Sequence, residues 1–596
     1  MEKTNEKITN QTKAIQLPLY NRLWFIMLMS AVIGAISFLS IYGFKILDPT
    51  YEEWLLQGGD LTQHYLGWVY YRKSEWQFPI GMIDGLIGNV KTAIMYTDSI
   101  PVLAVFFKLL SPVLPETFQY WGIMGLLSFM LNGACSSFLI HRFNKNGIFC
   151  IIGSILYILC PAILMRMFGH EALACHYIII LGMILWLYQD YKWKKKWQRY
   201  IMPAVLWGLL GMLSVSTHMY YIPMVYFFLL GSFITDFFKH KEISRPLFNF
   251  VSITVCSLFT MWIIGAFSIN AAISDVGLGV TSANYNTLWN PAEYFGNGLS
   301  GYTVGGSTFL KPLPNFDGQY EGYAYIGFGI MTGLLISLTV IIINAVKSEG
   351  GFIKNIRNIF NIRRTWIIAF SIIFILAMFY AASPSGVLND KKIYDIYYSE
   401  NVLKFMASFR ATGRFAWICD YIIFTAVIYA LSRIKPKQIM TAALVICVAI
   451  QLIDIFPSIK SRRWYKQTYE INYDCLKDPR WEAAAEGCNK FVGLPYDQPD
   501  IYILEFTTFA YKHNMTINHF YVARPPFDDI LAQYEKTMEE LSDGKYDTNA
   551  LYVFLTDEFI PDIKGLKVYK LDEFYIVKFP GQKDLLENMP EPEKTK

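Results

Sequence analysis

Residues 48–101 read DPTYEEWLLQGGDLTQHYLGWVYYRKSEWQFPIGMIDGLIGNVKTAIMYTDSIP. This polar, carboxylate-rich stretch follows the first long apolar run, residues 22–44, and precedes a chain that is apolar over most of its remaining length. The order predicts a loop, residues 45–98, that lies at a membrane surface between the first span and all the others. Its acidic residues are therefore the first candidates for chemistry.

The composition predicts an integral membrane protein. Of the 596 residues, 54% are hydrophobic and 17% charged, and the mean hydropathy is +0.30, which is too apolar for a soluble chain of this size. The net charge of +4 does not imply a nucleic acid partner. Cys475 and Cys488 share a polar region, and the sequence is consistent with either a disulfide between them or two free thiols.

About eleven apolar runs approach the 20 residues that a membrane span requires. Residues 99–114 are too short and too rich in proline for a span, so they predict a helix that dips into the outer leaflet. The eleven runs are 22–44, 120–140, 147–165, 177–190, 200–216, 221–237, 247–268, 323–345, 366–382, 415–432 and 439–456.

The basic residues predict the orientation of the spans. With the basic segment 1–21 inside, as an uncleaved cytoplasmic start, alternate connections carry positive clusters, as the positive-inside rule requires. These clusters are Arg142 and Lys145; Lys192, Lys194, Lys195, Lys196 and Arg199; Lys239, Lys241 and Arg245; Lys347, Lys354, Arg357, Arg363 and Arg364; Arg433, Lys435 and Lys437. The transmembrane domain, 22–456, is thus multi-pass in the cell membrane.

The tail, residues 457–596, is then extracytoplasmic. Its turn-forming clusters alternate with short apolar runs such as LYVFLTDE and FYIVKF, a pattern typical of a small α/β domain.

Asp60 opens a predicted helix with a polar face. At 100° per residue, one face carries Asp60, Gln63, His64, Gly67 and Tyr71, so we expect a helix lying flat at the interface with this face toward the protein. Asp60 is a candidate catalytic base, and the alternative that it only caps the helix is equally open. His64 is interpreted as a hydrogen-bond partner rather than a metal ligand, because no second ligand follows four residues later.

Asp98 is the second catalytic candidate. It precedes Ser99 and Pro101, so a role as the cap of the dipping helix is at least as well supported. Glu52 and Glu53 are predicted to be solvated loop charges.

Four ionisable residues lie near the predicted outer ends of two spans: Arg166, His170, Glu171 and His218. Such groups are costly near lipid unless they line a polar cavity. We therefore predict that they line a substrate site.

FRATGRF, residues 409–415, carries Arg410 and Arg414 four residues apart at the outer end of a span. Two guanidinium groups on one face of a helix N-terminus suit a phosphate at the membrane surface; the alternative is a pair that snorkels to lipid headgroups. Loop 269–322 is rich in aromatic residues, Asn and Gly, and with Glu321 and Tyr323 it predicts either a sugar-binding surface or a packed lid. Glu321 also complements the dipole of the span that follows.

The motifs GGDLTQHYLGW, YTDSIP, RMFGHEALACH, EGYAYIGFG and FRATGRF resemble those of an uncharacterised bacterial membrane-protein family assigned to the GT-C superfamily of glycosyltransferases. One span, a long acidic outer loop, many further spans and an outer C-terminal domain also resemble that superfamily. The resemblance implies a polyprenyl-phosphate-linked sugar as donor, Asp60 as base candidate, and Arg410 and Arg414 as phosphate contacts. Neither an Asp-x-Asp nor an Asp-Glu pair occurs at Asp60, because Leu61 and Thr62 follow it, and dependence on a divalent metal stays open.

The sequence thus predicts an inverting transferase that passes a sugar to a glycan or lipid acceptor of the cell envelope at the outer face of the membrane. The alternatives are a transporter or flippase of lipid-linked glycans and a cell-wall polymer assembly protein. Membrane lipids are the remaining expected partners.

Overall fold

A computed structural model describes residues 18–189, 195, 197–270, 277–295, 302–316, 318–347 and 352–590. Most of the predicted cytoplasmic segment 1–21 lies outside these residues. So do Lys192, Lys194 and Lys196 of one predicted positive cluster, and parts of loop 269–322.

Nine helical segments within the described residues are long and apolar enough to cross a membrane. They correspond to nine of the eleven predicted runs, which is consistent with a multi-pass membrane protein. A 3-10 turn, Thr412–Phe415, leads directly into α14. The helices are α1 Leu23–Tyr42, α4 Trp121–His141, α8 Gln198–Thr217, α9 Tyr221–His240, α10 Ser244–Ile263, α11 Phe328–Lys347, α12 Phe352–Ala381, α14 Ala416–Leu431 and α15 Lys437–Asp454.

The other two predicted runs form shorter helices, α5 Gly147–Ile158 and α7 Tyr177–Leu187. Pro161 ends the first of them, because proline has no N–H to donate, and it starts the single turn α6 Pro161–Arg166 instead. The chain between α6 and α7 is therefore not part of a continuous span. It carries His170 and Glu171, and Arg166 is the last residue of α6.

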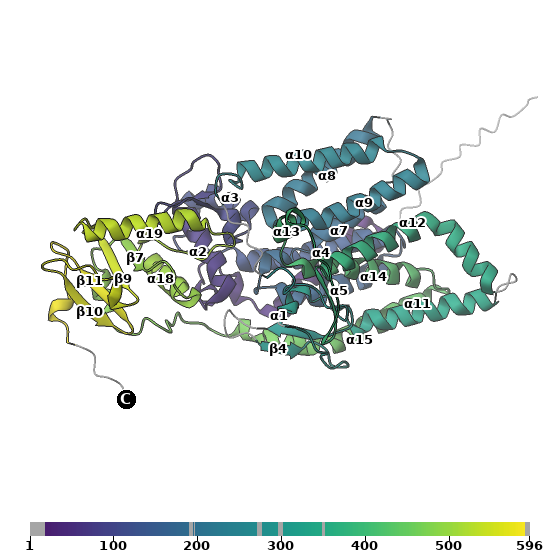
Figure 1. Ribbon diagram of the computed structural model, residues 1–596. Helices are drawn as coiled ribbons and strands as arrows, with labels where there is room; N and C mark the ends of the chain where they lie inside the picture. Colours follow the sequence, from purple (N-terminus) through teal and green to yellow (C-terminus); the bar gives the residue numbers. More distant parts are fainter. Residues whose placement is uncertain are drawn as a thin grey trace, which may run out of the picture.

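Helix α2, Gly59–Lys73, does not lie flat on a membrane. All residues from Leu61 to Tyr71 are buried, on the predicted polar face and on the opposite one alike, so the expectation of an interfacial helix is wrong. The reason is that α2 lies between the long helices and the C-terminal domain, where it packs against α18 Asp500–Lys512 (Figure 1).

The dipping segment forms α3, Pro101–Leu109, which exposes Val102, Phe106 and Leu109. Its place in an outer leaflet stays a prediction. The remaining short elements of this half of the chain are α13 Glu400–Ala407 and three two-stranded hairpins, β1 Met82–Ile83 with β2 Thr92–Ala93, β3 Ala292–Phe295 with β4 Tyr302–Gly305, and β5 Ser385–Leu388 with β6 Lys391–Asp395.

The tail forms a small domain with helices and one sheet, as predicted. The sheet has the order β10-β11-β9-β7-β8; β7 pairs in parallel with β8 and β9, and β11 runs antiparallel to β9 and β10. Cys475 and Cys488 are both free. The elements are α16 Phe456–Ser461, α17 Trp481–Ala485, β7 Lys490–Leu494, α18, β8 Thr516–Ile517, α19 Phe527–Ser542, β9 Ala550–Phe554, β10 Lys567–Leu571 and β11 Phe574–Lys578.

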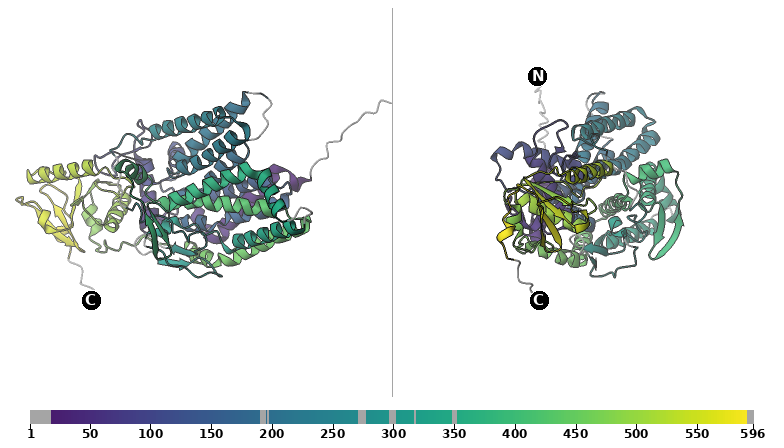
Figure 2. Two further views of the ribbon diagram at one scale, coloured as in Figure 1. Left: turned by 45° about the vertical axis from the view of Figure 1, so that its right-hand side comes forward. Right: turned by 60° about the vertical axis from the view of Figure 1, so that its left-hand side comes forward.

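The C-terminal domain covers one end of the helical bundle in every view (Figure 2). Glu52 joins the two: its carboxylate accepts hydrogen bonds from the hydroxyl groups of Tyr65 and Tyr511 and pairs with Lys512. Glu52 is only 3% exposed, so the prediction of a solvated charge is wrong. A buried carboxylate needs such partners to offset its desolvation.

Candidate functional site

A cavity of about 500 Å³ lies between the helical bundle and the C-terminal domain. Polar groups from both parts line it, together with aromatic rings that are suited to an apolar face of a ligand. The residues that matter below are Asp60, Arg166, Glu321, Arg462, Trp464, Tyr465, Tyr473, Asp500 and Tyr521.

Asp60 stands in the first turn of α2 and is exposed to this cavity. The cap position of α2 is Gly58, and no side chain caps the helix, so the interpretation of Asp60 as a cap is wrong. The protein surrounding the cavity raises the pKa of Asp60 by desolvation, against the lowering effect of His64. A carboxylate with a raised pKa at a cavity is a candidate general base.

Asp98 lies behind the cavity, outside its lining. Its backbone is left-handed, with φ at 52°, and it does not cap α3, whose cap residue is Ile100. The loop is fixed against α2, because the hydroxyl of Ser99 donates to the carbonyl of His64 at 2.6 Å. This conformation is uncommon for a residue other than glycine and turns Asp98 toward a group of histidines.

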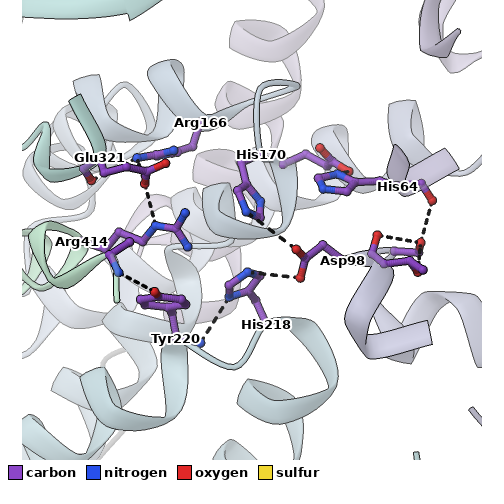
Figure 3. A network of polar contacts seen from close by, with 12 residues as sticks. His64, Asp98, Arg166, His170, His218, Tyr220, Glu321 and Arg414 are labelled. Atoms are coloured by element: carbon purple, nitrogen blue, oxygen red, sulfur yellow. Dashed lines mark hydrogen bonds and ion pairs between the residues drawn. The ribbon is translucent and has the colours of Figure 1, made fainter. Parts of the chain in front are cut away.

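Two histidines face the carboxylate of Asp98 (Figure 3). Nε2 of His170 lies 3.9 Å from Oδ2, and Nε2 of His218 lies 3.5 Å from Oδ1. Burial raises the pKa of Asp98 to about 6, although His64 and Arg414 oppose it. Burial and then the charge of Arg414 lower the pKa of both histidines well below the usual value, so at neutral pH they are uncharged.

His64 is bonded on the other side of the group. Its Nδ1 lies 2.8 Å from Oε1 of Glu171, and the indole of Trp121 donates to the same oxygen. Burial lowers the pKa of His64, but Glu171 outweighs it and raises the pKa to about 9. His64 makes a hydrogen bond, as predicted, and its partner Glu171 lies 107 positions away along the chain.

Two arginines share Glu321. Oε2 of Glu321 accepts from Nη2 of Arg166 at 2.7 Å and from Nε of Arg414 at 2.8 Å, and the guanidinium of Arg414 lies 4.4 Å from the ring centre of Tyr220. Burial raises the pKa of Glu321, but the two arginines outweigh it and lower the pKa to about 2. This buried group, Arg166–Glu321–Arg414, carries one net positive charge beside the cavity.

Arg410 is not on the same helix face as Arg414. It precedes the 3-10 turn Thr412–Phe415 and lines a second cavity, of about 370 Å³, with His519 and Arg524 of the C-terminal domain. The prediction of one guanidinium pair is wrong, because the helix begins only after Arg414. The two cavities share Asp500 and Tyr521.

Tyr323 is buried and is absent from the lining of the 500 Å³ cavity. Nearby, the amide of Asn284 donates to Gln319 and that of Asn286 to Asn389. The first bond lies within loop 269–322 and the second joins this loop to the turn between β5 and β6, which favours the packed-lid interpretation over the sugar-binding one.

Sequence reasoning missed the residues that complete the cavity. Arg462, 1% exposed, pairs with the buried Glu293, and Trp464 and Tyr465 follow it along the cavity wall. The basic RRWYK stretch, residues 462–466, after the last span was the available signal. No sequence signal pointed to Asp500 and Tyr521, since only the docking of the C-terminal domain brings them to the cavity.

These observations define a helical protein of multi-pass membrane type whose polar groups meet beneath a C-terminal α/β domain. The chain belongs to the family described as domain of unknown function (DUF6311), which matches residues 31–456. The DUF6311 C-terminal domain matches residues 480–579. No curated protein matches the chain.

Proposed function

We propose that the protein is a membrane glycosyltransferase of GT-C type, which moves a sugar from a polyprenyl-phosphate donor to a cell-envelope glycan or lipid acceptor. The site would lie at the outer face of the cell membrane, with the N-terminus cytoplasmic and the C-terminal domain outside. The observation that carries the proposal is the 500 Å³ cavity, where Asp60, an arginine group and aromatic rings meet.

Asp60 is the general base in this mechanism. It takes the proton of an acceptor hydroxyl while that oxygen attacks the anomeric carbon and the bond to the phosphate oxygen breaks. Inversion at the anomeric carbon follows from this single displacement. Asp60 is favoured over Asp98 because it faces the cavity, whereas Asp98 is enclosed behind it.

The leaving polyprenyl phosphate needs positive charge more than a proton. Arg166 lines the cavity and Arg414 is joined to it through Glu321, so the group offers its net positive charge to the phosphate. Because Glu321 already orients both guanidinium groups, little reorganisation accompanies the reaction. Trp464 and Tyr465 would contact the apolar face of the sugar.

The proposal is tested on cells that carry or lack the gene. Their envelope polysaccharide is compared for one missing sugar, and the deletion is complemented with wild-type protein, Asp60→Asn, or the exposed control Asp543→Asn at equal expression. We expect the wild type and Asp543→Asn to restore the sugar and Asp60→Asn to fail. Restoration by Asp60→Asn would favour a flippase, whose polar path a neutral isostere preserves.

A further inference from the structure

The histidines around Asp98 form a second centre that the proposed transfer does not use. One nitrogen of His64, one nitrogen of His170 and one carboxylate oxygen of Asp98 all lie within 4.8 Å of one another. The three residues come from α2, from the loop before α3, and from the segment between α6 and α7. Three imidazole or carboxylate ligands on separate elements are the usual set for a transition-metal site.

His64 is oriented as a metal-bound histidine is. Its Nδ1 is bonded to Glu171, to which Trp121 also donates, so Nε2 is the nitrogen that can bind an ion, and binding would release the proton of Nε2. Nε2 is buried and has no hydrogen-bond partner among the described residues. In many zinc sites a carboxylate accepts a hydrogen bond from one ring nitrogen of a histidine and so orients the other nitrogen toward the ion.

Asp98 and His170 have the spacing of two ligands rather than of a hydrogen bond. Their closest atoms are 3.9 Å apart, which is too long for a hydrogen bond and close to the separation of about 3.4 Å between two ligands of a tetrahedral ion with bonds near 2.1 Å.

His218 supports Asp98 and is not a ligand itself. Its Nδ1 accepts the amide hydrogen of Tyr220 at 3.2 Å, so in the neutral ring Nε2 carries the proton. That Nε2 lies 3.5 Å from Oδ1 of Asp98. The other oxygen, Oδ2, is left to face His170.

We propose that His64, Asp98 and His170 bind one divalent transition-metal ion of the Zn²⁺ class, with Glu171 and His218 as positioning residues. Two imidazole nitrogens disfavour Mg²⁺ and Ca²⁺, which prefer oxygen ligands. Three protein ligands leave one position open, as in metal sites that bind a further molecule. The site lies one helical turn from Asp60 through His64. The proposal stands on these residues and does not depend on the transferase reaction.

The test uses the full chain, purified in detergent without a histidine tag, stripped with a chelator and then dialysed against Zn²⁺. Elemental analysis should find about one zinc per chain, as one three-ligand site predicts, and Co²⁺ should give the visible absorption of a bound ion. Mg²⁺ in excess should not displace the zinc. Wild-type protein that retains no zinc after this treatment overturns the proposal.

Variants locate the ion. His64→Gln and His170→Gln should each lose the zinc and the Co²⁺ absorption, whereas His176→Gln, another buried histidine, bonded to Tyr421, should retain both. Glu171→Gln should keep the Co²⁺ spectrum but bind Zn²⁺ about 10- to 100-fold more weakly. Equal zinc in His64→Gln, His170→Gln and wild type would place the ion elsewhere and overturn the assignment.

Folding and function are separated by two further measurements. Size-exclusion chromatography and circular dichroism test whether each variant is folded. If both ligand variants misfold, zinc binding by the wild type alone tests whether the protein holds an ion. If the wild type binds zinc but transfers no sugar, the metal site is supported and the transferase proposal is overturned. If the wild type transfers sugar but binds no zinc, the transferase proposal is supported and the metal site is overturned.

Discussion

The cavity and the histidine group, His64, Asp98, His170 and His218, give two carboxylates of residues 48–101 different surroundings. Asp60 is exposed to the cavity, whereas the side chain of Asp98 is 18% exposed and faces histidines. Around the cavity, arginines carry the positive charge; around Asp98, the neighbours are mostly neutral rings. From this difference we expect separate tasks for the two residues: Asp60, in the first turn of α2, faces the cavity, whereas Asp98 faces two histidines behind it.

Asp60→Asn should have the largest effect on transfer. Loss of a general base lowers turnover by roughly 10²- to 10⁴-fold, while the neutral isostere leaves the arginine group and donor binding in place. Turnover and donor affinity are measured separately, with lipid-linked sugars extracted from the protein's own cells. The zinc content should stay unchanged in Asp60→Asn and fall in Asp98→Asn. Equal loss of zinc in both variants would contradict the division of tasks.

Glu321→Gln should cause the largest loss of stability. It leaves Arg166 and Arg414 buried without their counter-charge, and breaking such a group costs about 3–5 kcal/mol. Thermal unfolding in detergent measures the change. Glu400→Gln is the control, because its pair with Lys404 is exposed and should contribute almost nothing.

The same variant should change the dependence of stability on pH. Glu321 titrates at about 2 in the fold, against 4.5 for a free glutamate. A lowered pKa contributes stability that is complete above about pH 4.5 and is lost as the pH falls toward 2. Glu321→Gln should lack this component of the acid transition, and an unaltered transition would show that the two arginines do not depend on Glu321.

Gly67→Ala should disturb the histidine group and not the cavity. A Cβ at Gly67 would lie 2.4 Å from the Cβ of Thr97 and 2.9 Å from the hydroxyl of Ser99, so the loop of Asp98 must shift, at a cost of about 1–3 kcal/mol. Gly169→Ala is the matched control, since its nearest neighbour is 3.6 Å away. Unfolding midpoints compare the two; equal values would mean that α2 does not fix the position of Asp98.

Glu52→Gln should have the smallest effect and should act on domain docking. Gln can still accept hydrogen bonds from the tyrosines, so only the charge assistance is lost, about 1 kcal/mol in all once solvent screening of the partly exposed Lys512 is counted. We expect faster proteolysis of the C-terminal domain with little change in the helices. Glu53→Gln, at the neighbouring position, should leave the cleavage rate unchanged. Equal cleavage of both variants would show that Glu52 does not join the domains.

The sequence by itself determined the helical architecture. Nine of the eleven apolar runs form helices of membrane length, because about 20 consecutive apolar residues can satisfy their backbone only as helices. Alternating runs such as LYVFLTDE and FYIVKF became strands β9 and β11. The carboxylates of loop 45–98 and the group Arg166, His170, Glu171 and His218 were singled out as candidates from their places near the ends of runs, but of these four residues only Arg166 lines the cavity.

Only the tertiary structure decided which of these groups meet. Helical periodicity relates residues within about one turn, so it could join His64 to Asp60 but not to Glu171, and it wrongly joined Arg410 to Arg414. The contacts of Glu321 with two distant arginines, of Glu52 with the C-terminal domain, and of Asp98 with two histidines are set by how helices and domains pack. A buried charge takes whichever partner the packing places beside it, and the spacing along the chain does not record that partner.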